Sequence, residues 1–113
     1  MKDKMKCLTA IEYLKKTYKN DKSFYARKAV LCKDGFVISI QGGTDGHYCL
    51  PRMHCNIYDN VELGFPSKRE NLIMEYIEDN ENPTETVYGY VPIEIVEKVI
   101  KKHGGIVGTV KLT

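Results

Sequence analysis

The fold is decided by the stretch Phe24-Tyr-Ala-Arg-Lys-Ala-Val-Leu-Cys-Lys-Asp-Gly-Phe-Val-Ile-Ser-Ile40. Both of its halves are rich in residues that favour strands, and Asp34-Gly35 between them is a two-residue turn signal. We therefore predict a β-hairpin with a type I′ turn. In that register Leu31 faces Ile38, and the hairpin has one apolar face.

Three helices are expected around this hairpin, because apolar residues recur there at helical spacing. Thr9 and Glu12 have the capping-box pattern, which predicts a basic helix over about residues 9–20. Ser67 and Glu70 repeat the pattern before a second helix. Pro92 can begin a third helix, because a proline is tolerated in the first turn. His103 comes directly after that helix, where we expect its side chain to interact favourably with the helix dipole.

Three further strands are expected, at residues 61–65, 86–91 and 106–112. In the second of them, Tyr88 and Tyr90 are expected on one face, because side chains alternate along a strand. This order of elements predicts an α+β fold, with a largely antiparallel sheet of about five strands and about three helices. We expect residues 1–113 to form a single domain.

Composition and charge exclude several classes of protein. The 113 residues are 42% hydrophobic and 28% charged, which is ordinary for a globular domain. The net charge of +2 argues against a general nucleic-acid binder. Residues 1–33 nevertheless carry ten basic and three acidic side chains, and residues 67–97 carry two basic and eight acidic ones. Such asymmetry suits an anionic partner, or solvated faces that balance each other in the fold.

The cellular compartment follows from what the sequence lacks. No run approaches the roughly 18 apolar residues of a membrane span, and Met1–Ala10 has no apolar signal segment. We therefore expect no membrane contact and a reducing cytoplasm, in which the four cysteines remain thiols. Cys7 and Cys32 are expected to be structural, and no cofactor is expected.

A long loop, residues 42–58, holds most of the unusual chemistry, and loops of this length are commonly functional. Its glycines, Gly46 among them, can present backbone amides to an anion, and Arg52 offers a planar fork for phosphate or carboxylate. His47 and Tyr48 can stack on a planar ring or form hydrogen bonds with it. The candidate ligand-binding residues are Gly42, Gly43, His47, Tyr48, Arg52, Tyr88 and Tyr90.

Three other interpretations of the loop compete with ligand recognition. Four of its side chains have zinc-ligand chemistry: His47, Cys49, His54 and Cys55. Their spacing differs from the two separated pairs of a structural zinc site, so no metal is expected. Cys49 or Cys55 as a nucleophile would need a histidine base nearby in space. In the plainest alternative the loop is simply packed, with Tyr48 and Leu50 covering the sheet and Arg52 paired to a nearby acid such as Glu62.

Several longer motifs carry a resemblance. They are Gln41, His47-Tyr-Cys-x-Pro-Arg52, Val61-Glu-Leu-Gly-Phe-Pro-Ser67, Thr86-Val-Tyr-Gly-Tyr-Val-Pro92 and His103-Gly-Gly-Ile106. With them, the stretch from Gly35 to Ile106 resembles small uncharacterised proteins of phages and prophages, and the basic N-terminal helix lies outside it. The resemblance implies a small protein made in the cytoplasm of a bacterial host. Phage proteins of this size are often accessory binders, including inhibitors of CRISPR effectors and sponges for nucleotide immune signals.

The function expected from these observations is that of a non-enzymatic binding protein, used by a phage or prophage in counter-defence. Its partner would be an anionic, nucleotide-derived small molecule or a host immune protein, and a homo-oligomer is compatible with either. One alternative is inhibition of a CRISPR or other immune effector by direct protein contact. Another is a small Cys/His enzyme that acts on nucleotides.

Overall fold

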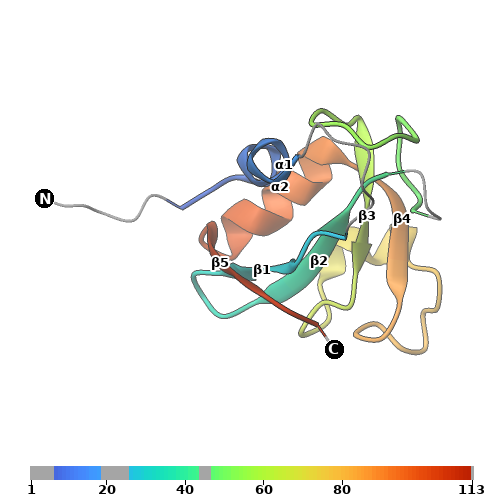
Figure 1. Ribbon diagram of the computed structural model, residues 1–113. Coiled ribbons are helices and arrows are strands. Elements are labelled where there is room, and N and C mark those ends of the chain that lie inside the picture. Colours follow the sequence, from blue (N-terminus) through green and yellow to red (C-terminus); the bar gives the residue numbers. More distant parts are fainter. Residues whose placement is uncertain (1–6, 19–25, 44–46, 113) are drawn as a thin grey trace, which may run out of the picture.

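A five-stranded antiparallel sheet lies at the centre of the molecule, shown in Figure 1 as a computed structural model that describes residues 7–18, 26–43 and 47–112. Within these residues the elements are α1 (Ala10–Thr17), β1 (Ala29–Cys32), β2 (Val37–Gln41), β3 (Asn60–Gly64), the 3₁₀ helix η1 (Asn71–Tyr76), β4 (Val87–Pro92), α2 (Ile93–Lys102) and β5 (Ile106–Val110). The predicted α+β fold and its order of elements are confirmed. Residues 24 and 25 of the predicted first strand lie outside the description.

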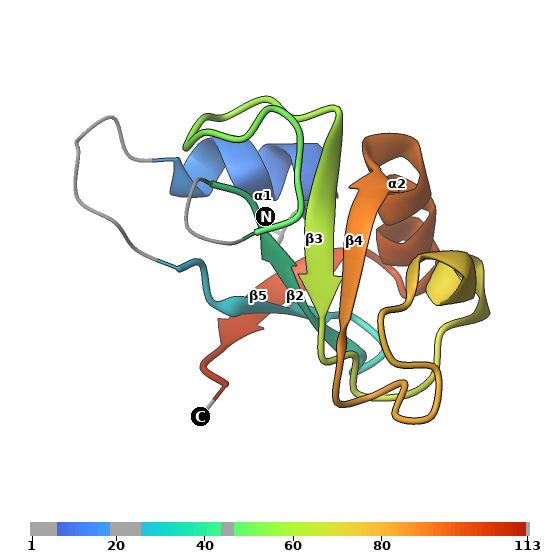
Figure 2. The same ribbon diagram turned by 90° about the vertical axis from the view of Figure 1, so that its right-hand side faces the viewer.

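The helices cover one face of the sheet. The strand order is β4-β3-β2-β1-β5, and each neighbouring pair is antiparallel. α1 and α2 lie side by side against one face (Figures 1 and 2), and they bury Leu14, Val96 and Ile100 against Val30, Ile38 and Leu63. Among the described residues no helix lies over the opposite face, and none has the length and apolar character needed to cross a membrane.

The turn between β1 and β2 has three residues instead of the predicted two. The Gly35 amide donates to the Cys32 carbonyl at 2.9 Å, and Gly35 has a φ of +97°. This is the geometry of a type I turn followed by a left-handed residue. Val30 therefore pairs with Ile38, and the predicted pairing of Leu31 with Ile38 is wrong by one residue.

The second predicted capping box is also wrong. The Ser67 hydroxyl accepts from the Val37 amide at 3.0 Å, and this bond ties the segment to the sheet. Glu70 caps the helix instead, because its carboxylate accepts from the Leu72 amide at 3.0 Å. The helix is a short 3₁₀ helix, and Ile73 is its only fully buried residue. Of the apolar residues predicted to face the core, Ile73, Tyr76 and Ile77 pack against it, whereas Leu72 is 38% exposed.

α1 confirms the first capping box. The Glu12 amide donates to the Thr9 hydroxyl at 3.1 Å, and the Thr9 amide donates to the Glu12 carboxylate at 2.9 Å. Glu97 of α2 accepts from the first two amides of α1 at 2.7 and 3.0 Å, and so joins the two helices. α1 ends at Thr17, and residues 19–20 of the predicted helix lie outside the description.

Candidate functional site

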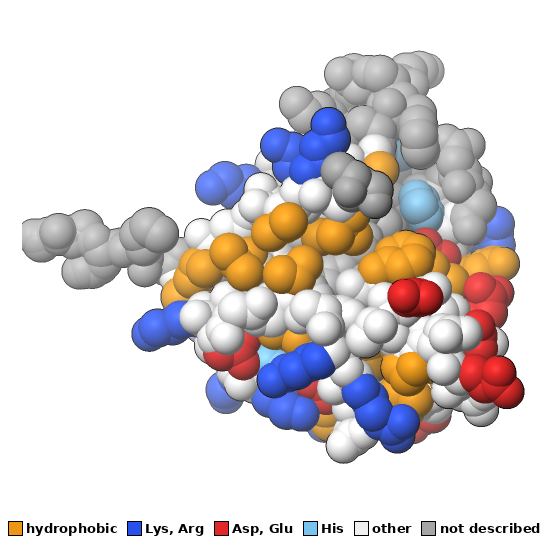
Figure 3. All heavy atoms as spheres, turned by 90° about the horizontal axis from the view of Figure 1, so that it is seen from below, with side chains coloured by type: hydrophobic (Ala, Val, Ile, Leu, Met, Phe, Trp, Pro, Cys, Tyr) orange, Lys and Arg blue, Asp and Glu red, His pale blue; other side chains and the backbone are white. Residues whose placement is uncertain are grey.

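A groove of about 580 Å³ lies on the sheet face that the helices leave uncovered. β1, β2, β3 and β4 all contribute to its lining, together with the segment after β5. Figure 3 looks onto this side of the molecule, where apolar side chains form a band with basic side chains on either side. The volume lies in the range of small-molecule sites, which makes this groove the leading candidate for a ligand site.

The floor of the groove is polar and closely bonded. The Gln41 side chain donates to the Arg27 carbonyl at 2.6 Å and to the Ser39 hydroxyl at 3.0 Å, and it accepts from the Arg27 amide at 3.0 Å. Ser39 and Gln41 are each less than a tenth exposed. These bonds fix the side chains in place before any ligand arrives.

His47, a predicted site residue, lies in this groove beside Glu62. Its Nδ1 lies 3.0 Å from a Glu62 carboxylate oxygen, and the Tyr48 amide donates to the other oxygen at 3.4 Å. Glu62 is 8% exposed. Arg52 does not pair with Glu62, and its side chain donates to the Tyr90 hydroxyl instead. The floor therefore presents oxygen acceptors to a ligand.

Two lysines, Lys28 and Lys111, line the groove, and both are exposed. They are next in the chain to Ala29 and Val110, the pair at the end of the β1–β5 ladder. An anionic group in the groove would be attracted by both charges.

Phe65 forms part of the groove wall in a strained conformation. Its φ is +52°, and its side chain is 45% exposed. Tyr90 is the other described non-glycine residue with a positive φ, at +53°. Backbone strain of this kind clusters at functional sites.

Tyr88 and Tyr90 do not share a strand face, so that prediction is wrong. Val61 pairs with Val91 and Leu63 pairs with Tyr88, which leaves one extra residue on β4. Such a bulge turns the chain and breaks the alternation of side chains. Tyr88 is fully buried in the core, and Tyr90 is 42% exposed.

Three of the predicted site residues meet outside the groove. An Arg52 nitrogen donates to the Tyr90 hydroxyl at 3.2 Å, and the Tyr48 and Tyr90 rings lie 5.8 Å apart. The Tyr90 amide donates to the Tyr48 carbonyl at 2.9 Å. The structure thus divides the predicted site, with His47 at the groove and Tyr48, Arg52 and Tyr90 on an exposed surface beside it.

Gly42 and Gly43 are buried and have packing roles. A Cβ on Gly42 would lie 2.5 Å from the Tyr58 ring. The Gly43 amide donates to Sγ of Cys49 at 3.3 Å. Gly42 therefore lets the chain pass close to the Tyr58 ring, and the Gly43 amide is directed at sulfur. The third glycine of the predicted anion cradle, Gly46, lies outside the described residues.

Gly42→Ala is expected to lower the free energy of unfolding by about 1–3 kcal/mol, because the added methyl group overlaps the buried Tyr58 ring. Gly108→Ala is the matched control, since a Cβ there has no neighbour within 4 Å. Urea unfolding of both variants tests this expectation. Equal midpoints for the two variants would show that the ring moves aside without cost.

The loop cysteines have the contacts of structural thiols. Cys49 is fully buried, and its Sγ donates to the Gly43 carbonyl at 3.4 Å. Burial raises the pKa of the Cys49 thiol, which disfavours a nucleophilic thiolate. Cys55 bonds to the Ile57 carbonyl through Sγ. Among the described residues, no group of three His, Cys, Asp or Glu side chains could hold a metal ion.

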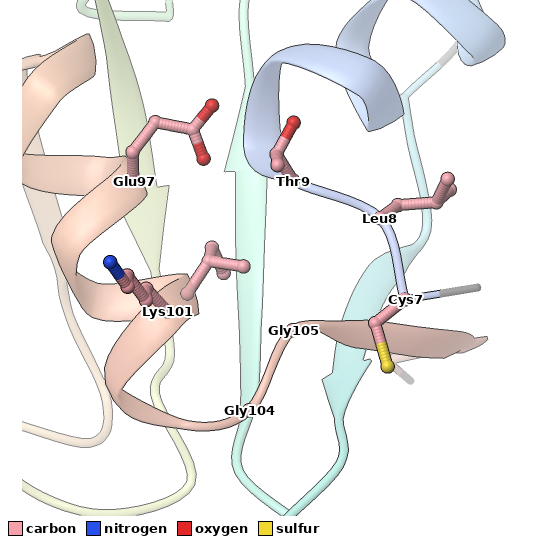
Figure 4. A pocket seen from close by; sticks show the side chains of 8 residues that line it. Cys7, Leu8, Thr9, Glu97, Lys101, Gly104 and Gly105 are labelled. Atoms are coloured by element: carbon pink, nitrogen blue, oxygen red, sulfur yellow. The ribbon is translucent and has the colours of Figure 1, made fainter.

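A smaller cavity of about 350 Å³ lies between the start of α1 and the last turns of α2 (Figure 4). Two of its polar lining groups are already bonded, since Glu97 accepts from α1 amides and Thr9 belongs to the capping box. We assign no ligand to this cavity, because these groups hold the two helices together.

Sequence reasoning missed a charged cluster around His103. This ring is 4% exposed and stacks on Phe36 at 3.9 Å between centroids. Nδ1 lies 2.6 Å from an Asp34 oxygen, and Nε2 lies 2.7 Å from a Glu70 oxygen. Glu70, only 1% exposed, also accepts from Lys102 at 2.9 Å. The cluster joins the β1–β2 turn, η1 and α2, and both ring nitrogens are occupied, so its role is structural.

Comparison of the chain with family models, with curated proteins and with solved structures finds no match. Its function is therefore inferred from the geometry of the groove and from the sequence motifs.

Proposed function

We propose that this protein is a non-enzymatic binding protein that holds a small anionic ligand of the nucleotide class in the sheet groove. The observation that carries the proposal is the combination of an acceptor-rich floor, apolar walls and a pair of lysines at the rim, all within one groove of about 580 Å³.

Each part of the groove selects one part of the ligand. Glu62 and Gln41 on the floor favour a group that donates hydrogen bonds, such as the exocyclic amine of a nucleobase. Phe65, which also lines the groove, offers an apolar surface to a planar ring. Lys28 and Lys111, which line the groove as well, attract a phosphate or another anionic group. A nucleotide combines a hydrogen-bond donor, a planar ring and an anionic phosphate.

The lining supports binding more than catalysis. The Ser39 hydroxyl accepts from the Gln41 amide, and Nδ1 of His47 is paired with Glu62. None of the described cysteines lines the groove. The described lining therefore supplies hydrogen bonds and charge, without a nucleophile paired to a base.

The biological use that we propose is counter-defence inside a bacterial cell, by sequestration of a nucleotide signal. Its support is the resemblance of residues 35–106 to small phage and prophage proteins. The most direct experiment heats the purified protein, removes the precipitate and analyses released small molecules by mass spectrometry. A released nucleotide is the expected result. An empty supernatant, together with no thermal shift from a panel of linear and cyclic nucleotides, would overturn the proposal.

The rim lysines give a quantitative test. Reversing both charges, Lys28→Glu with Lys111→Glu, is expected to raise the Kd of the nucleotide identified in that panel at least about tenfold per charge, because charge-assisted hydrogen bonds are lost. Lys98→Glu is the matched control, since Lys98 is an exposed lysine on α2 outside the groove. Isothermal titration with the three proteins measures the difference. Equal affinity for the double variant and the control would exclude the lysine pair as the anion site.

A further inference from the structure

We propose that the loop between β2 and β3 is a docking surface for a second copy of this chain. The surface, called the loop patch below, consists of Tyr48, Leu50, Arg52, Met53, Ile57 and Tyr90. It lies at the end of the sheet where β3 begins and β4 ends, as Figures 1 and 2 both show for this loop. The proposal is independent of the groove and of its ligand.

The loop patch concentrates exposed apolar surface. Of the nine large hydrophobic side chains that are exposed in the described part of the chain, five lie in it, with Met53 at 53% and Ile57 at 66% exposure. Contiguous apolar patches on a protein surface mark sites of association. Tyrosine, methionine and arginine, which make up four of its six residues, are enriched in the buried centres of interfaces.

Residues 50–58 of the loop are fixed by hydrogen bonds. The buried Tyr58 hydroxyl donates to the Met53 carbonyl at 3.0 Å and accepts from the Cys55 amide at 3.1 Å. The Leu50 amide donates to the Asn60 carbonyl at 3.2 Å and so anchors the loop on β3. The apolar side chains are therefore held outward by an ordered backbone. A surface ordered in advance loses less conformational entropy on binding.

The strained backbone of Tyr90 is a second observation that points to a role for this surface. The left-handed backbone of Tyr90 costs free energy, and it places the side chain outside the core, where its hydroxyl accepts from Arg52. An extended backbone without the bulge would bring Tyr90 to the same face as buried Tyr88. The exposed position of the Tyr90 ring in the loop patch therefore lowers the stability of the fold.

The charges at the loop patch favour a second copy as its occupant. In a dimer with a two-fold axis, the same patch of both copies meets. Each copy must therefore carry both residues of every pair that forms across the interface. Arg52 supplies a cation. Exposed Asp59 supplies an anion on the same loop, next to Leu50, because the Asp59 amide donates to the Leu50 carbonyl at 2.9 Å. Arg52 of one copy can therefore meet Asp59 of the other. The net charge of +2 adds only weak repulsion between copies.

The test is sedimentation equilibrium of the full chain without added ligand, at about 1 to 300 µM protein. The wild type is expected to be a dimer in this range. Met53→Glu is expected to raise the dissociation constant at least about 100-fold, because it places a charge among the exposed apolar side chains of the loop patch. Leu72→Glu, a change of the same kind at an exposed leucine on η1, is the control and should leave the dimer intact. Circular dichroism confirms that each variant is folded.

A charge exchange tests the pairing itself. Arg52→Glu alone is expected to weaken the dimer at least about tenfold, and adding Asp59→Arg is expected to restore it, because the pair is reformed with its signs exchanged. A wild type that stays monomeric to about 300 µM overturns the proposal. Equal effects of the Met53 and Leu72 variants, or a double variant no tighter than Arg52→Glu, would likewise overturn it.

Discussion

Replacing His103 by alanine is expected to lower the free energy of unfolding by about 3–5 kcal/mol at pH 7, the usual cost of removing one member of a buried charged cluster. Asp34 and Glu70 approach the two ring nitrogens at 2.6 and 2.7 Å. The ring therefore links the two carboxylates through both of its nitrogens. His103→Ala therefore leaves Glu70 inside the protein with Lys102 as its remaining charged partner.

Urea unfolding at pH 7 measures this loss. Asp34→Asn is the matched control, because its side chain is 45% exposed and the amide keeps an oxygen that accepts from the ring. Its unfolding midpoint is expected to move much less than that of His103→Ala. A His103→Ala variant with the wild-type midpoint would mean that the cluster contributes nothing to stability.

The same cluster predicts a loss of stability in acid. Burial alone would raise the pKa of Glu70, but the bonds from the Leu72 amide, His103 and Lys102 outweigh it and hold this pKa below its ordinary value of 4.5. The unfolded chain then binds the proton more readily than the folded chain. The contribution of Glu70 is therefore complete at neutral pH and is lost as the pH falls below about 4.5. Stabilities of the wild type and His103→Ala, measured against pH, should converge in that range.

Local patterns in the sequence predicted the elements and their order, because helical spacing and strand alternation depend on neighbours in the chain. They predicted the β1–β2 turn incorrectly, and tertiary contacts explain why. Asp34 uses one oxygen to accept from the Phe36 amide at 2.9 Å and the other to bind His103, 69 residues away. Those bonds occur together with the three-residue turn. The residues near Asp34 in the sequence do not indicate that His103 will be its partner.

Of the candidate site, the sequence predicted only what depends on residues close together in the chain. The loop was identified by its length and composition, and His47 and Arg52 both have contacts that suit binding. The groove itself was missed, because residues from four strands and the C-terminal segment line it. The extra residue that separates Tyr88 from Tyr90 was missed as well, since a bulge depends on the pairing with β3.

Arg27 is the second residue whose role depends on distant parts of the chain, and Arg27→Met is expected to lower the free energy of unfolding by about 3 kcal/mol. Its side chain donates to the Thr17 hydroxyl at 2.7 Å and to the carbonyls of Leu14, Gly42 and Cys55, each at 3.4 Å. The residue is 4% exposed, so these acceptors cannot all turn to water when the donors are removed. Methionine fills much of the volume of the arginine stem, so the measured change reports mainly the loss of the guanidinium group.

The geometry also explains why lysine should not replace Arg27. The guanidinium reaches the C-terminal end of α1, where carbonyls carry partial negative charge, and it bonds the two ends of the loop at Gly42 and Cys55. A lysine ammonium carries the same charge but lacks the planar fork that spans these directions. Arg27→Lys should therefore recover less than half of the stability lost in Arg27→Met, measured by urea unfolding. Lys28→Met, an equal charge change at the exposed neighbour, should leave stability nearly unchanged. If Arg27→Lys matched the wild type, charge alone would account for the role of Arg27, and the bonded fork would not be needed to hold the loop against α1.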